Sequence, residues 1–261
     1  MARRNRPRSD GSSAPRARRT PKPDPTTEEL AELDRLTDEL PAPLRELRDR
    51  GLLSAKRRFY LEQAIRNRTR SLVVVLHGVH DPHNQAAVMR TCEALGIQEL
   101  VVVAEADEPF RPSGRVTQNA FRWLDLTSRP DFDGAAAALR DRGLRLLAAS
   151  FDGEPLAAVD FTRPTALVFG NESRGLPPPV VAGCDGSFSI PMYGLSQSLN
   201  VSVAAGVALH WAVEARRRAH GEPGDLDEAE RAELRRRFYL QAAGAKLPED
   251  LRRRIEALSE P

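Results

Sequence analysis

The chain has 261 residues and a net charge of +2, and with 41% hydrophobic and 29% charged residues it has the composition of a globular protein of one or two domains. It lacks both a run of about 18 apolar residues and the apolar core of a signal peptide, so we expect no membrane span and a cytoplasmic location. Two cysteines, Cys92 and Cys184, are too few for a disulfide framework and are expected to be buried thiols.

Residues 1–25 form a strongly basic N-terminal tail. They contain eight Arg or Lys residues and two Asp residues, a net charge of +6. With five prolines and no apolar periodicity, the tail is expected to be disordered. Such tails commonly add salt-dependent affinity for nucleic acid, and the alternative is a solubilising segment without a partner.

Residues 26–70 are expected to form a helical N-terminal extension. Thr26 with Glu29 is typical of a helix start, and Pro41 should end that first helix. A second helix is expected over residues 45–66. Its charge fits either a solvated helical face or a surface that follows an RNA backbone. The basic residues up to the end of the extension are Arg45, Arg48, Arg50, Lys56, Arg57, Arg58, Arg66, Arg68 and Arg70.

From Ser71 to Ala219 short apolar runs alternate with helical patterns. Runs without polar interruption are typical of strands buried on both faces. Strands are expected at residues 72–76, 100–103, 121–124, 144–149, 165–169 and 188–190, and helices at 85–95 and 131–142. This alternation predicts an α/β domain with a mainly parallel sheet. Residues 220–261 follow as a charged C-terminal extension, with helices expected at 225–239 and 248–258.

The segment 190–209 is expected to be the centre of this domain. It should run from a strand end, through a turn at Gly194, into a helix that is apolar on nearly all sides. Such a helix is buried all round, in a core or against a partner. Its expected first turn is nevertheless polar and contains Ser196, Gln197, Ser198 and Asn200. Capping accounts for one or two of these residues, so we expect a binding site here.

Three loops at the carboxyl ends of expected strands cover residues 149–153, 170–177 and 191–194. Parallel α/β domains bind their ligands at such ends, and Gly170 and Gly175 permit close backbone approach or a positive φ. The glycine motifs that cradle the phosphates of dinucleotides and nucleoside triphosphates are absent. No metal is expected either. His77, His80 and His83 fall in a loop, where a spacing of three places no common ligand face.

Three motifs, in order, resemble those of the SPOUT superfamily, and more narrowly the SpoU/TrmH group of RNA ribose 2′-O-methyltransferases. They are His83-Asn84-x5-Arg90-Thr91, Phe169-Gly170-Asn171-Glu172-x-x-Gly175-Leu176, and Ile190-Pro191-Met192-x-Gly194-x-x-Gln197-Ser198-Leu199-Asn200-Val201-Ser202. The resemblance covers about residues 71–216 and is greatest to the enzymes that methylate guanosine 18 of tRNA.

The resemblance implies a deep trefoil knot at the C-terminal end of the sheet, S-adenosylmethionine as cofactor, RNA as substrate and a homodimer. It implies that the catalytic residues are Asn84, Arg90, Glu172, Ser198 and Asn200. It implies that the cofactor contacts Ala149, Gly170, Asn171, Gly175, Ile190, Met192 and Leu199. From the residues alone, Arg90 is either a functional cation or an ordinary surface arginine.

Two departures from the tRNA-specific pattern leave the substrate open. Asp81 stands where those enzymes often have Lys, and residues 171–175 have the general SpoU form. Methylation of a ribose in 23S rRNA is therefore the alternative to tRNA. A non-catalytic RNA-binding protein with the same knot is the other alternative, although mere binding does not need the intact set of expected catalytic residues.

Overall fold

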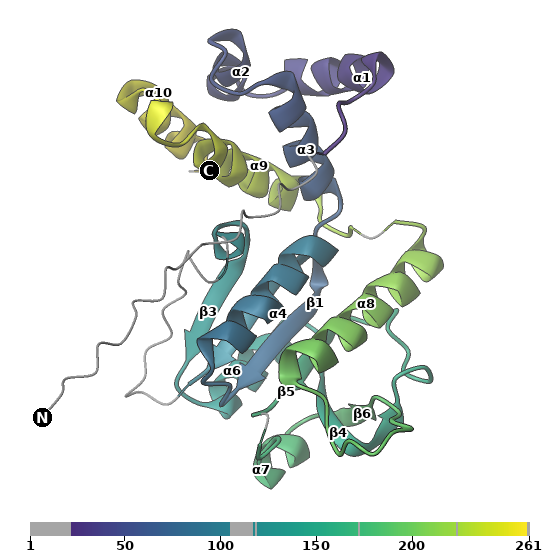
Figure 1. Cartoon of the computed structure of the whole chain (residues 1–261). Helices are drawn as coiled ribbons and strands as arrows, with labels where there is room; N and C mark the ends of the chain where they lie inside the picture. The colour runs from purple at the N-terminus through teal and green to yellow at the C-terminus, as the bar shows by residue number, and fades with distance from the viewer. Residues whose placement is uncertain (1–21, 105–116, 118, 172, 223, 260–261) are drawn as a thin grey trace, which may run out of the picture.

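The computed structural model describes residues 22–104, 117, 119–171, 173–222 and 224–259. Its centre is a parallel sheet with the strand order β3-β2-β1-β5-β4-β6 (Figure 1). The strands are β1 (Thr69–His77), β2 (Ile97–Val103), β3 (Asp125–Arg129), β4 (Arg145–Pro155), β5 (Thr165–Phe169) and β6 (Gly186–Ser189). The expected α/β class and parallel sheet are confirmed.

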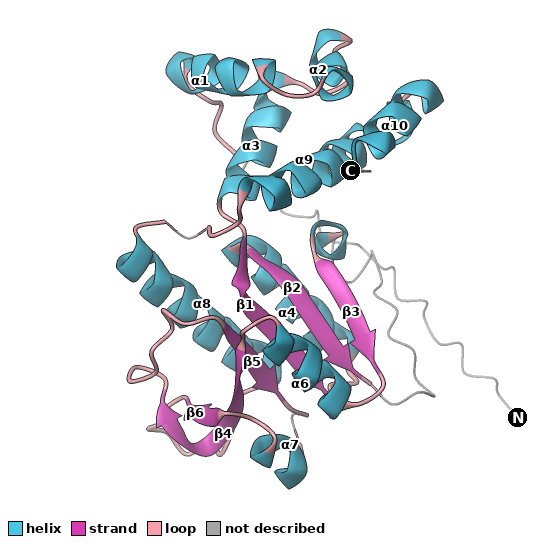
Figure 2. Cartoon of the chain, turned by 180° about the vertical axis from the view of Figure 1, so that it is seen from behind, coloured by secondary structure: helices cyan, strands magenta, loops and turns pink. Residues whose placement is uncertain are grey.

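Helices cover both faces of the sheet. Figure 2 shows α6 and α7 on the opposite face from α4 and α8. The helices are α1 (Thr27–Asp38), α2 (Ala42–Asp49), α3 (Ala55–Arg66), α4 (Pro82–Leu95), α6 (Phe132–Asp141), α7 (Pro178–Ala182), α8 (Val201–His220), α9 (Glu228–Ala243) and α10 (Glu249–Glu256), with 3-10 turns η1 (Ala120–Trp123), η2 (Gly244–Lys246) and η3 (Ala257–Ser259). None of these helices is long and apolar enough to cross a membrane.

The continuous apolar run of β1 follows from its position between the two helix layers. Leu72, Val74 and Leu76 belong to the core shared with α4 and α8. Val73 and Val75 belong to the core shared with α6 and α7. All five side chains are 0% exposed, so every position of the run meets an apolar layer and a polar residue would lose its hydration.

The expected helix boundaries of the α/β domain are largely confirmed. α4 ends at Leu95, just before Gly96, which adopts φ +79°, a conformation that favours glycine. It begins at Pro82 rather than Gln85, because Asp81 Oδ1 accepts a hydrogen bond from His83 N at 2.8 Å and caps the helix. Asp131 caps α6 in the same way, accepting from Gly134 N at 2.7 Å.

The strand expected at residues 121–124 is wrong. This segment is the 3-10 turn η1, and the edge strand β3, which was not expected, follows it. The ring of Trp123 packs edge-on against Phe238 of α9 at 5.1 Å, and Gln98 Nε2 donates to Trp123 O at 3.1 Å. A segment of only four residues cannot be assigned by periodicity, and here the contact with α9 decides its conformation.

The two extensions pack together into one helical unit, made of α1, α2, α3, α9 and α10 (Figure 1). Its apolar core draws on both ends of the chain: Leu44, Leu47, Leu53, Leu61, Ile65, Leu226, Leu234, Phe238, Tyr239, Ala243, Leu247, Leu251 and Ile255. The single helix expected over residues 45–66 is instead two helices. Gly51 at φ +65° separates them, and Ser54 Oγ accepts from Arg57 N to start α3.

Several cations of the helical unit serve its own packing. Arg58 and Arg68 are buried, and Arg58 donates to Thr37 Oγ1 at 3.2 Å. Arg235 of α9 pairs with Glu62 of α3 at 2.9 Å, with both side chains about nine-tenths buried. The sequence predicted for these cations either a solvated helical face or a surface that follows an RNA backbone. Neither applies to Arg58 and Arg68, because a buried guanidinium faces neither water nor RNA.

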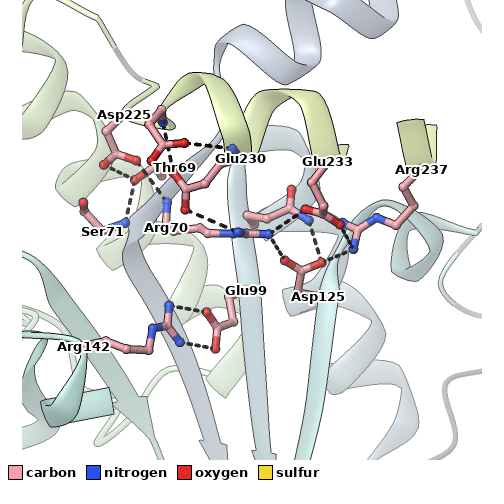
Figure 3. Close-up of polar contacts among 12 residues, drawn as sticks. Thr69, Arg70, Ser71, Glu99, Asp125, Arg142, Asp225, Glu230, Glu233 and Arg237 are labelled. Atoms are coloured by element: carbon pink, nitrogen blue, oxygen red, sulfur yellow. Dashed lines mark hydrogen bonds and ion pairs between the residues drawn. The ribbon is translucent and has the colours of Figure 1, made fainter. Parts of the chain in front are cut away.

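Ion pairs fix the helical unit to the N-terminal edge of the sheet (Figure 3). Arg70 of β1 pairs with three carboxylates, Asp125 at 2.8 Å, Glu230 at 3.3 Å and Glu233 at 3.2 Å. Asp225 accepts from the Thr69 hydroxyl at 2.6 Å and from Arg70 N at 3.1 Å. The carboxyl edge of the sheet, where ligands bind in such folds, lies at the other end of the strands.

Candidate functional site

A cavity of about 440 Å³ lies beside the middle of β4 and at the carboxyl ends of β5 and β6. Its walls come from residues 149–151, 169–171, 173–176, 181, 188–190, 192 and 197–199, with Val201 and Ala204 from the start of α8. Parts of the three segments singled out in the sequence therefore meet here, but residues 149–153 are not the expected loop, because they belong to β4, which continues to Pro155. The volume is in the range of pockets that enclose a single small organic molecule.

All the residues expected to contact a cofactor line this cavity, namely Ala149, Gly170, Asn171, Gly175, Ile190, Met192 and Leu199. Of the expected catalytic residues, Ser198 lines it, whereas Asn84, Arg90 and Asn200 do not. Glu172 lies outside the described residues. The sequence interpretation assigned no role to the wall residues Phe151 and Leu176, although both lie in segments that it singled out. It did not include Val181, which lies in α7 and gives no signal in the sequence beyond its apolar side chain.

The loop after β5 is shaped by its two glycines in different ways. A Cβ on Gly170 would lie 2.5 Å from Gly175 O, so a side chain at Gly170 does not fit the backbone of Gly175. A Cβ on Gly175 would meet no atom within 4 Å, but this residue adopts φ +67°. Gly170 is therefore needed for close backbone approach and Gly175 for its conformation.

The side chain of Asn171 holds this loop to a neighbouring one. Its Oδ1 accepts from Ser173 N at 2.9 Å and from Arg174 N at 3.3 Å. Its Nδ2 donates to the carbonyl oxygen of Gly78 at 3.1 Å, in the loop after β1. Asn171 thus lines the cavity while its amide is already used to connect the ends of β1 and β5.

The segment before α8 differs from the sequence interpretation. α8 begins at Val201, so Ser196, Gln197 and Ser198 lie in a loop and not in the first turn of the helix. Asn200 is the cap: its Oδ1 accepts from Ser202 N at 2.9 Å and from Ser202 Oγ at 2.6 Å. Two residues of this loop, Gln197 and Ser198, line the cavity.

Asn200 also joins the loop before α8 to α4. Its Nδ2 donates to Asn84 Oδ1 at 3.0 Å, which brings together two of the expected catalytic residues. Arg90 does not join them. Six residues correspond to about 9 Å along a helix and to faces about 120° apart, so Arg90 and Asn84 point in different directions. Arg90 is exposed, and its guanidinium forms no ion pair with another described residue.

Within one chain the helix α8 is buried on one side only, and the expected burial of its other side against a partner stays a prediction. Val201, Ala205, Leu209 and Ala212 belong to the core of the domain. On the other side Val203, Val207 and Trp211 are 50%, 43% and 43% exposed. These three residues are spaced by four and form one exposed apolar stripe, which we call the α8 stripe.

The cysteines and histidines take no evident part in this site. Burial raises the pKa of the Cys92 thiol to about 12 and that of the half-buried Cys184 thiol to about 11, so both stay protonated near neutral pH. The expected burial is confirmed for Cys92 and only partly met by Cys184. Across the described ranges no three His, Cys, Asp or Glu side chains gather into a metal site.

Comparison with known proteins matches the region that contains this cavity. Residues 71–210 match the model of a family described as the SpoU rRNA Methylase family. A tRNA (guanosine(18)-2′-O)-methyltransferase of Thermus thermophilus is 38% identical over 171 residues, which span 62% of this chain and 84% of that protein.

Solved structures give the same assignment. The Aquifex aeolicus TrmH/SpoU tRNA modifying enzyme matches with a TM-score of 0.63 and 31% identity, over 69% of this chain and 93% of that one. The SpoU methyltransferase AviRb of Streptomyces viridochromogenes, in complex with its cofactor AdoMet, matches with a TM-score of 0.53 and 28% identity, over 60% of this chain and 62% of that one. The family match begins within β1 and ends within α8, so it includes the whole cavity.

Proposed function

Because the chain belongs to the SpoU rRNA Methylase family, we propose that it transfers a methyl group from S-adenosylmethionine to the ribose 2′-hydroxyl of guanosine 18 in tRNA. Family membership makes it a methyltransferase that uses S-adenosylmethionine and acts on RNA ribose. The choice of tRNA and of this nucleotide is the proposal. The observation that supports it most is the cavity lined by residues of the second and third motifs, in a chain 38% identical over 171 residues to a tRNA enzyme.

The residues of the cavity fit S-adenosylmethionine. Leu176 and Val181 supply an apolar wall suited to a purine ring, and Gln197 and Ser198 supply polar groups. Arg174 is the charged side chain among the described residues that line the cavity, and it could pair with a carboxylate. Such a mixture of an apolar wall and a few polar groups is typical of cofactor sites.

The cofactor supplies an electrophilic methyl group on a positively charged sulfur. The 2′-oxygen forms a bond to this carbon as the carbon–sulfur bond breaks and the 2′-proton leaves to a base or to water. We propose that Arg90 stabilises the negative charge that develops on the 2′-oxygen and holds the adjacent phosphate. A guanidinium does not give up its proton in proteins, so Arg90 is not the base.

The other expected catalytic residues have positioning roles in this proposal. Ser198 on the cavity wall orients the cofactor. Asn200 and Asn84 are joined by a hydrogen bond of 3.0 Å and hold the loop before α8 against the start of α4. Glu172 remains an expected acceptor for the proton or for the charge of the cofactor.

We further propose that the enzyme is a homodimer in which Arg90 acts on the cavity of the partner subunit. Within one chain Arg90 is exposed on α4 and is not a wall residue of the cavity. The α8 stripe beside α4 offers an apolar surface that a second copy could cover. Sedimentation at micromolar concentration should then give about twice the chain mass of 28.9 kDa. A clean monomer would refute this part of the proposal.

We also propose that the C-terminal end of the sheet forms the trefoil knot that the resemblance implies. β4 pairs with both β5 and β6, and residues of the segment 190–199 after β6 line the same cavity as residues 149–151 of β4 and the loop after β5. This arrangement supports a chain that passes through the loop between β5 and β6. A crystal structure in which residues 190–199 run outside that loop would contradict the knot.

A ribose in 23S rRNA is the alternative substrate, in line with the name of the family. Asp81, which departs from the tRNA-specific pattern, has a structural role as the cap of α4, so its presence does not argue against tRNA. Mapping ribose methylation in total RNA, with and without the protein, tests the proposal directly. We expect one methylation, at guanosine 18 of tRNA. A methylation that appears in 23S rRNA instead would favour the alternative.

A further inference from the structure

Phe151 has an unusual position at the cavity. It lines the cavity wall, yet its side chain is 75% exposed. It lies in a bulge of β4, where the pairing with β6 is interrupted between Ala149 and Glu154. Bulges next to functional sites commonly re-aim a side chain, and this one places the ring at the open side of the cavity.

The bulge is built into the backbone. A Cβ on Gly153 would lie 2.5 Å from the backbone of Phe188, so only glycine allows β4 to return to β6 at this distance. Ser189 Oγ donates to Gly153 O at 2.9 Å and holds the returning strand. The position of Phe151 is therefore set by strand pairing on both sides of the bulge.

Of the aromatic rings among the described wall residues, Phe151 alone has a face available to a ligand. Phe169 and Phe188 are each 1% exposed and pack edge-to-face against each other, with their centroids 5.8 Å apart. The described wall residues also include no Asp or Glu. Among these residues, the negative face of the Phe151 ring is thus the group suited to attract a cation.

The proposed function requires a cation at the open side of the cavity. The RNA is too large to enter the cavity, so the methyl group and the sulfonium that carries it must face the open side. We propose that Phe151 presents its ring to that sulfonium and thereby favours S-adenosylmethionine over the neutral product S-adenosylhomocysteine. This inference rests on the proposed function and adds a residue that selects the charge state of the cofactor and aids product release.

Isothermal titration of both ligands against the full chain tests this role. Phe151→Leu keeps an apolar side chain but removes the ring, so the ratio of the two affinities should shift about threefold to tenfold against S-adenosylmethionine. Phe151→Trp should keep or increase the preference of the wild type. Tyr193→Leu is the matched control, because Tyr193 is 97% exposed and is not a wall residue, and its ratio should not change.

Each other outcome overturns the inference. An equal loss of affinity for both ligands would mean that Phe151 contributes packing alone, and unchanged affinities would mean that it does not touch the cofactor. A change confined to RNA affinity, or to dimerisation seen by sedimentation, would assign the ring to a nucleobase or to a second copy. A wild-type protein that binds neither ligand would refute the proposed function itself, which is a distinguishable result.

Discussion

Asn200 Nδ2 donates a hydrogen bond to Asn84 Oδ1 at 3.0 Å across 116 residues of sequence. The same Asn200 side chain accepts two hydrogen bonds from Ser202, through Ser202 N and Ser202 Oγ. Both ends of the amide are therefore used, one to cap α8 and one to hold α4. Because residues 197–199 line the cavity just before this cap, the pair links the cavity wall to the helix that carries Arg90.

Substitutions of Asn200 should separate its two roles. Asn200→Ala removes the cap, so it should lower the free energy of unfolding by about 1 kcal/mol. It should also lower the affinity for the cofactor. Asn200→Asp keeps a good cap but cannot donate to Asn84, so it should unfold near the wild-type temperature and still lose activity. Thermal unfolding and methyl-transfer assays measure the two effects. Full activity in Asn200→Asp would show that only the cap matters.

Substitutions of the two glycines after β5 should have unequal effects. Gly170→Ala places a methyl group 2.5 Å from Gly175 O, so the loop must shift and cofactor affinity should fall by about tenfold or more. Gly175→Ala meets no atom within 4 Å and adds only the strain of φ +67°, roughly 1 kcal/mol. Titration with S-adenosylmethionine measures both. A larger loss at Gly175 would contradict the assigned roles.

Arg90→Lys and Arg90→Ala should both bind the cofactor and lose methyl transfer. We expect a loss on the order of 10² or more, as for the removal of one transition-state donor, with more activity left in Lys because it keeps the charge. The pH profile of the wild type should contain no ionisation that depends on Arg90. An ionisation that is present in the wild type and absent in Arg90→Lys would instead support a general base.

Mixing two impaired variants, at a concentration of S-adenosylmethionine too low to saturate Gly170→Ala, should restore activity if Arg90 acts across the dimer. Arg90→Ala keeps an intact cavity, and Gly170→Ala keeps an intact Arg90. A heterodimer of the two then contains one complete site, so mixtures should recover up to about a quarter of wild-type activity if subunits exchange at random. Each variant alone is the control. Failure of the mixture to recover, with exchange verified by sedimentation of tagged chains, would place Arg90 and the cavity in the same subunit.

Removal of residues 1–21 should weaken RNA binding without changing the chemistry. This segment contains seven arginines and one aspartate, whereas Lys22 and Pro23 already contact α3 through Lys56 and Tyr60. Each RNA phosphate that the truncated chain no longer neutralises should reduce the salt dependence of log K by roughly 0.7–0.9. Filter binding over a range of salt concentrations measures the slope. An identical slope in the truncated chain would mean that the tail touches no phosphates.

Periodicity and end signals predicted much of the α/β domain. The run Leu72–Leu76 is buried as expected, and Gly96 ends its helix as expected. Such signals work because they are local: alternation, caps and positive φ depend on a few neighbouring residues. The same signals were insufficient for residues 121–124, where the packing of Trp123 against α9 determines the conformation.

The sequence by itself predicted the family, the order of the motifs and most of the segments that line the cavity, because each of these resides in residue identity and short spacing. Only the tertiary structure decided which groups meet. It buried Arg58, paired Asn84 with Asn200, left Arg90 outside the cavity and turned Phe151 toward its open side. These relationships depend on which strands pair and which helix faces pack. Such contacts join residues far apart in the chain, so local sequence patterns do not predict them.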